Sequence, residues 1–154
     1  MAGIIEFHCR QHWDGHDEVE LRDILSVIEQ EGRRFIWVLR GLWVVGKITA
    51  IGATIRDLMD ESENSNFGVR KSWDQLVTFA DHVFQAIDGT FEAYRDAAEI
   101  PSSLVSFDER RAAMYASAQI VIEALDSTLW SVFAQDEVLL GRVRARFGGT
   151  DMPQ

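Results

Sequence analysis

The spacing of hydrophobic positions predicts strands and helices that alternate along the first half of the chain. Residues 4–9 form a short apolar run that is typical of a strand. From Asp17 to Gly32, apolar residues recur at intervals of three and four, which predicts a helix with one buried stripe. Residues 35–39 are apolar without polar alternation, the pattern of a strand covered on both faces, and residues 42–45 repeat it.

In the second half, capping residues mark where helices begin. Ser72 and Ser106 are each followed three positions later by a Gln or Glu, which is the pattern of a capping box. Segments 60–68 and 96–105 lack a regular period and are predicted to be loops. We expect helices at 48–58, 73–87, 107–125 and 136–147, and strands at 90–94 and 128–133.

Two segments of the second half resemble each other. Residues 80–90 and 118–128 share five identical residues at a constant spacing of 38. In each, a predicted helix leads through Asp, a small residue and Thr into a predicted strand. This succession favours parallel pairing of residues 90–94 with residues 128–133 through a right-handed crossover.

Together these elements predict one α+β domain over residues 1–149. It would contain a mixed sheet of about five strands packed with four to five helices, with βαβ-like units in its C-terminal half. Residues 150–154 are predicted to be a frayed tail.

Composition and charge narrow the class of protein. The 154 residues include 15 Lys and Arg against 25 Asp and Glu, a formal net charge of −10 at pH 7. This balance opposes binding to nucleic acid, which needs clustered Lys and Arg. A hydrophobic content of 47% excludes a disordered acidic tail, and a lone Cys9 excludes a disulfide scaffold. Without a signal-peptide pattern or a membrane-spanning apolar run, we expect a cytoplasmic protein that does not bind membranes.

The negative charge is concentrated between residues 73 and 109, where eight carboxylates accompany a single base, Arg95. Such a field speeds association with a positive partner. The sequence therefore predicts a protein-binding module that presents an acidic face to a basic partner, with Trp13 as a candidate anchor. The alternative is a solvated face that only keeps the protein soluble. The candidate contact carboxylates are Asp74, Asp81, Asp88, Glu92, Asp96, Glu99, Asp108 and Glu109.

In size, charge, composition and helix–sheet layout, the chain resembles the small acidic immunity proteins of bacterial toxin systems. The resemblance rests on this general build, and it implies a bacterial protein whose partner is a toxin, such as a nuclease domain. Glycine-rich phosphate loops, H-E-x-x-H and G-x-S-x-G motifs are absent, which favours a protein that is not an enzyme. A further alternative is a structural domain that forms oligomers, for instance a homodimer.

Four potential metal ligands, His8, Cys9, His12 and His16, lie within nine residues and are donors that suit zinc. In a strand, however, His8 and Cys9 point to opposite faces. A chain reversal would gather only His12 and His16 with a nearby carboxylate. These two histidines predict, as an alternative function, a small metal-dependent or ligand-binding enzyme; otherwise no cofactor is expected.

Asp88 and Asp126 occupy matching positions in the two similar segments. Parallel pairing of the segments would place both carboxylates at one edge of the sheet, where such a pair can divide into acid and base. The simpler interpretation is that each aspartate bonds nearby backbone in a turn.

Overall fold

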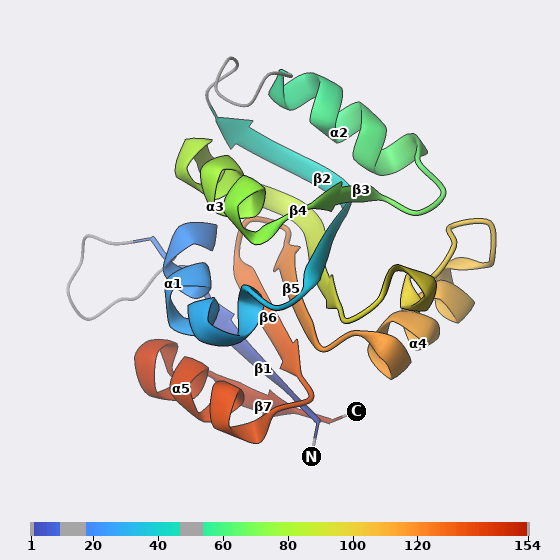
Figure 1. Ribbon diagram of the computed structural model, residues 1–154. Helices are drawn as coiled ribbons and strands as arrows, with labels where there is room; N and C mark the ends of the chain where they lie inside the picture. Colours follow the sequence, from blue (N-terminus) through green and yellow to red (C-terminus); the bar gives the residue numbers. More distant parts are fainter. Residues whose placement is uncertain (1, 10–17, 47–53, 154) are drawn as a thin grey trace.

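The computed structural model describes residues 2–9, 18–46 and 54–153 (Figure 1). In these residues seven strands form one open antiparallel sheet, in the order β3-β2-β4-β5-β6-β1-β7. The strands are β1 (Gly3–His8), β2 (Ile36–Gly46), β3 (Val69–Lys71), β4 (Val83–Tyr94), β5 (Ile120–Leu125), β6 (Leu129–Ala134) and β7 (Thr150–Met152). The helices are α1 (Leu21–Gly32), α2 (Ile55–Asn64), α3 (Trp73–His82), the 3₁₀ turn η1 (Ala97–Glu99), α4 (Phe107–Ser117) and α5 (Glu137–Phe147).

Helices α1, α3 and α5 cover one face of the sheet and bury the larger part of the core (Figure 1). The predicted stripe of α1 is buried, and its predicted end at Gly32 is confirmed, but the helix begins at Leu21 after an extended Glu20 and not at Asp17 as predicted. Two indoles from the sheet, Trp37 and Trp130, lie in this core at 0% and 2% exposure. Their N–H groups donate to the carbonyl oxygens of Gly32 and Val19, each at 2.9 Å. These hydrogen bonds remove the cost of burying an unpaired donor.

Helix α2 lies along the edge of β2, beyond the end of the short β3. The Leu42 N–H donates to Ser62 Oγ at 3.1 Å, and the Val44 N–H approaches Met59 Sδ at 3.5 Å. A strand edge with unpaired backbone donors is a template for aggregation. Side chains of α2 therefore take the place of a missing neighbouring strand.

The opposite face of the sheet combines a small apolar cluster with a polar row. The cluster joins α4 to the sheet and contains Val38, Tyr94, Met114, Val121 and Phe133. The strand register places a polar residue at the same level of five adjacent strands, from β2 to β1: Arg40, Thr90, Glu123, Ser131 and Glu6. The first four of these are buried, so each needs a partner.

The α+β class is confirmed, but the predicted parallel pairing of residues 90–94 with 128–133 is wrong. Helix α3 ends at His82, and the chain runs directly into β4. Helix α4 ends at Ser117, and residues 120–125 form β5, which turns back into β6 as a hairpin. The apolar residues of these strands complete hydrogen-bonded ladders on both sides, which outweighs their local helical spacing. The similar segments are therefore not βαβ units, and the sheet has seven strands instead of about five.

Two element ends also differ from the prediction. Gly148 and Gly149, with φ of 69° and 104°, turn the chain back after α5, and Thr150–Met152 pair with β1. These three residues are thus a strand and not a frayed tail. The helix predicted at 48–58 is α2, which begins at Ile55 and extends into the predicted loop 60–68, whereas residues 48–53 lie outside the described residues.

Candidate protein-contact site

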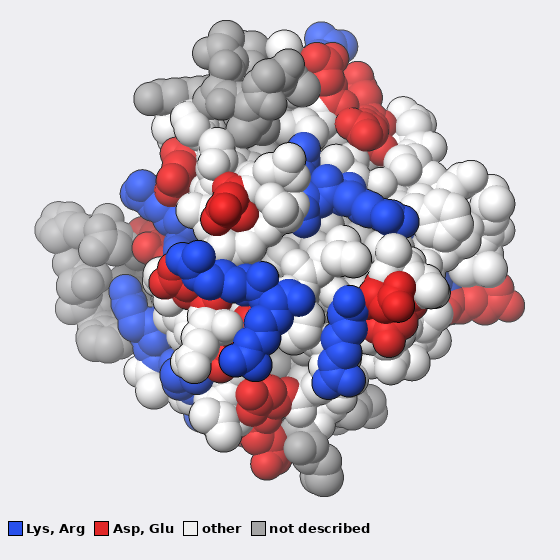
Figure 2. All heavy atoms as spheres, in the orientation of Figure 1, with Lys and Arg blue, Asp and Glu red and all other residues white. Residues whose placement is uncertain are grey.

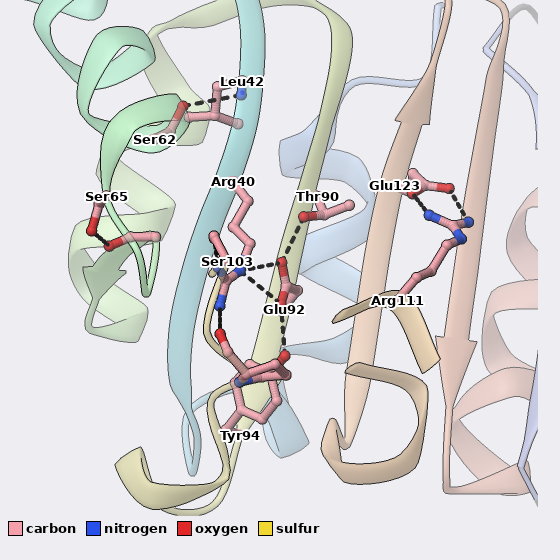
Figure 3. Close-up of polar contacts among 12 residues, drawn as sticks. Arg40, Leu42, Ser62, Ser65, Thr90, Glu92, Tyr94, Ser103, Arg111 and Glu123 are labelled. Atoms are coloured by element: carbon pink, nitrogen blue, oxygen red, sulfur yellow. Dashed lines mark hydrogen bonds and ion pairs between the residues drawn. The ribbon is translucent and has the colours of Figure 1, made fainter. Parts of the chain in front are cut away.

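A buried ion pair between Arg40 of β2 and Glu92 of β4 is the most strongly constrained polar contact of the structure. The two side chains are 4% and 0% exposed, and Arg40 Nε lies 3.3 Å from each carboxylate oxygen of Glu92. The hydroxyls of Thr90 and Tyr94 each donate to Glu92 at 2.6 Å (Figure 3). Burial and the adjacent Glu92 carboxylate raise the pKa of Tyr94, so its hydroxyl stays protonated and continues to donate. The carboxylate is thus satisfied on all sides.

The remaining nitrogens of Arg40 reach two loops that are distant in sequence. Nη1 donates to the Asn66 carbonyl oxygen at 3.4 Å and to Ser103 Oγ at 2.6 Å. Nη2 donates to the Pro101 carbonyl oxygen. The loops also bond directly, since the Ser103 N–H donates to the Asn66 carbonyl oxygen at 2.6 Å. One buried guanidinium therefore joins the turn between α2 and β3 to the loop before α4.

These two loops and the first residue of α4 carry large apolar side chains that face solvent. Phe67, Leu104, Val105 and Phe107 are 48%, 79%, 45% and 64% exposed. We call these four residues the two-loop surface. Loop tips of this kind usually carry small or polar residues, so an exposed apolar group on fixed backbone points to an intermolecular contact.

Acidic side chains flank the two-loop surface. Asp108 and Glu109 follow it in the first turn of α4, and Asp96 and Glu99 belong to η1, just before it; all four are exposed. The Ser117 hydroxyl donates to the Glu99 carbonyl oxygen at 3.0 Å, which ties η1 to α4. Figure 2 shows uncharged surface at the right edge of the view with acidic side chains below it.

A second ion pair holds α4 on the sheet. Arg111 donates to both oxygens of Glu123 on β5, at 2.7 and 2.9 Å (Figure 3). It also donates to the Tyr115 hydroxyl at 3.1 Å. Hydrogen bonding to Glu123 raises the pKa of Arg111, which remains charged throughout. Together, the Arg40–Glu92 and Arg111–Glu123 ion pairs hold the two loops and α4 against the sheet.

The structure does not gather the eight predicted contact carboxylates on one surface. Asp74 and Asp81 are exposed on α3, over the face opposite to α4. Glu92 is buried, so its predicted role as a contact residue is wrong. Its carboxylate instead forms an ion pair with Arg40 inside the protein. The four that lie around the two-loop surface are Asp96, Glu99, Asp108 and Glu109.

Asp88 and Asp126 do meet, although not as a catalytic pair. Asp88 Oδ1 accepts the backbone N–H of Asp126 at 3.0 Å and so braces the β5–β6 hairpin. Asp126 and Ser127 adopt φ of 49° and 59°, the left-handed pair of a tight hairpin turn. The turn-forming interpretation of these aspartates is the one that the geometry supports.

The predicted ligands His12 and His16 and the anchor Trp13 lie outside the described residues. Cys9 is buried, and burial together with the Glu18 charge raises the pKa of its thiol to about 11. Such a thiol is a poor nucleophile and a poor metal ligand. Within the described ranges, no cluster of three His, Cys, Asp or Glu side chains has the arrangement to hold a metal ion.

Comparisons with protein-family models, with curated proteins and with solved structures found no match for this chain. None of the helices in the described ranges has the length and apolar character that crossing a membrane requires. Sequence reasoning missed Arg40, Phe67 and Leu104. The only early signal was Arg40 itself, a lone charge that splits an otherwise apolar run of residues 35–46.

Proposed function

We propose that the protein is a binding module that docks a basic protein partner on the two-loop surface. The observation that carries the proposal is the exposure of four large apolar side chains on two loops that a buried Arg40 holds together. Clustered aromatic and aliphatic anchors supply most of the binding energy of protein interfaces. A rigid backbone beneath them lowers the entropy cost of association.

The charge around the two-loop surface supports a basic partner. Four exposed carboxylates flank the two-loop surface, where Arg110 lies over the Phe107 ring, and the chain as a whole carries −10. Negative potential accelerates encounter with a positive protein and makes the rate fall with salt. The general build shared with bacterial immunity proteins supports a toxin domain as the class of partner and the cytoplasm as the location.

Binding experiments with matched variants test this proposal. The partner is first captured from the native host on immobilised protein and then measured by surface plasmon resonance. The double variant Leu104→Ser/Phe107→Ser should lose binding by at least about 100-fold, since it removes two apolar anchors. Val138→Ser is the matched control because Val138 is 69% exposed on α5, away from the two-loop surface. It should bind as the wild type does.

Three results would contradict the proposal. Equal binding by the double variant and the control would remove the two-loop surface as the contact. A doubled mass in light scattering that the double variant abolishes would identify a homodimer interface in place of a basic partner. Loss of binding in Trp43→Ser alone would move the contact to the β2–β4 ribbon, where Trp43 is 60% exposed.

A further inference from the structure

A pocket of about 290 Å³ opens at one end of the sheet, where β2 and β5 begin and β4 and β6 end. It is separate from the two-loop surface. Its polar lining comes from Arg34, Arg95, Gln119, Gln135 and two carboxylates, Glu31 and Asp136. Figure 2 shows basic side chains gathered over this part of the face, although the protein is acidic as a whole.

The two arginines of the pocket are not paired with carboxylates. In the described ranges, six other arginines form ion pairs, whereas the side chains of Arg34 and Arg95 make neither an ion pair nor a hydrogen bond there. Arg34 and Arg95 are both exposed, as are Arg56 and Arg70, which also lack an ion pair in the described ranges; what sets Arg34 and Arg95 apart is that they line one pocket. They are available to a ligand.

The carboxylates at the pocket already have partners. Glu31 is bound by Arg142, which lies at 2.5 Å and whose pKa this contact raises. Asp136 caps α5, because its Oδ1 accepts the Val138 N–H at 2.8 Å. The start of α5 adds the positive end of a helix dipole. Arg34, Arg95 and Arg142 together outnumber Glu31 and Asp136, so the formal charge around the pocket is positive.

The other walls of the pocket are apolar. Phe35, Ile120 and Leu139 line it, and the last two are buried. The volume is at the lower end of the range for small-molecule sites, roughly 300–1,000 Å³. We propose that this pocket binds a small organic carboxylate, with its carboxylate between Arg34 and Arg95 and its aromatic or aliphatic body against the apolar wall.

Titration of ¹⁵N-labelled protein with benzoate tests the site. We expect a Kd on the order of 1 mM, as for other ligands of this size, with amide signals of residues 119–120 and 135 shifting. Arg34→Gln and Arg95→Gln should each weaken binding about tenfold, because each removes one charge-assisted hydrogen bond. Arg56→Gln is the control, since Arg56 is an exposed arginine on α2, outside the pocket lining.

Two control ligands test the parts of benzoate one at a time. Neutral benzamide has the ring without the negative charge, and inorganic phosphate has the negative charge without the ring. Both should bind at least about tenfold more weakly than benzoate. Benzamide binding equal to benzoate, or unchanged benzoate affinity in Arg34→Gln and Arg95→Gln, would overturn the proposal. So would tighter binding of phosphate, or the absence of shifts at residues 119–120 and 135.

Discussion

Replacing Arg40 by Met should destabilise the protein strongly, because it leaves Glu92 as an unpaired charge at 0% exposure. Removing one partner of a buried ion pair costs about 3–5 kcal/mol. The substitution also takes donors from Asn66, Pro101 and Ser103. For a domain of this length, the loss corresponds to a fall in Tm of about 6–20 °C. This loss is a large fraction of a total stability of about 5–15 kcal/mol.

A double variant distinguishes the effect of the unpaired charge from the effect of the lost loop contacts. Arg40→Met/Glu92→Gln removes the buried charge and keeps a carbonyl oxygen for one of the two hydroxyls, since Thr90 and Tyr94 bond different oxygens of Glu92, while the amide NH2 donates to the other hydroxyl. It should recover about 2–3 kcal/mol relative to Arg40→Met. The loops, however, stay without their guanidinium. Hydrogen exchange at the Ser103 N–H should therefore be faster than wild type in both variants.

Urea unfolding followed by circular dichroism measures the stabilities, and exchange by mass spectrometry follows residues 100–106. Arg33→Met is the control, since its pair with Glu29 is more than half exposed, and it should cost less than about 0.5 kcal/mol. A loss below about 1 kcal/mol in Arg40→Met would refute the buried pair as described. So would a double variant that is no more stable than Arg40→Met.

Three further predictions concern the edges of the fold. Ser127→Gly should raise the free energy of unfolding by about 0.5–1 kcal/mol, because glycine adopts the positive φ of this turn without strain; thermal denaturation measures it. Truncation after Gly149 removes β7 and exposes β1 as an edge, so unfolding in urea should show a loss of about 1–2 kcal/mol. Burial keeps Cys9 protonated in the native state to about pH 11, whereas it ionises near pH 9 when unfolded. Native stability should therefore fall between these pH values, and Cys9→Ala should flatten that part of the curve.

Local patterns predicted the elements whose signals lie within a few residues. The apolar stripe of α1 and the capping boxes at Ser72 and Ser106 gave correct helix starts or faces. They failed at residues 83–87 and 118–125, where apolar spacing is compatible with helix or strand. Only the neighbouring strands decide between them, and those neighbours come from parts of the chain up to 42 residues away.

The candidate contact site was harder to predict because the two residues beneath it, Arg40 and Glu92, are distant in sequence and meet only when β2 and β4 pair. Glu92 counts as one acid among eight in the sequence, yet the structure buries it against Arg40, 52 residues earlier. Likewise, Phe67 and Leu104 lie in separate loops, and nothing in the sequence says that they share a surface. Their proximity follows from the register of β2 and β4 and from the hydrogen bonds of one guanidinium.

Some of the carboxylates behind the net charge of −10 stabilise the fold. The net charge therefore overstates the number of free carboxylates that a partner could contact. In the described ranges, Asp88 braces a hairpin turn and several other acidic side chains cap helices, among them Asp23, Asp57, Asp96, Glu109 and Asp136. Of the predicted contact carboxylates near the two-loop surface, only Glu99 and Asp108 make no side-chain hydrogen bond within the described ranges. In the proposed function, these two carboxylates steer a basic protein and the apolar side chains beside them supply affinity. The proposal therefore rests less on the total charge than on two unbonded carboxylates that adjoin exposed apolar surface.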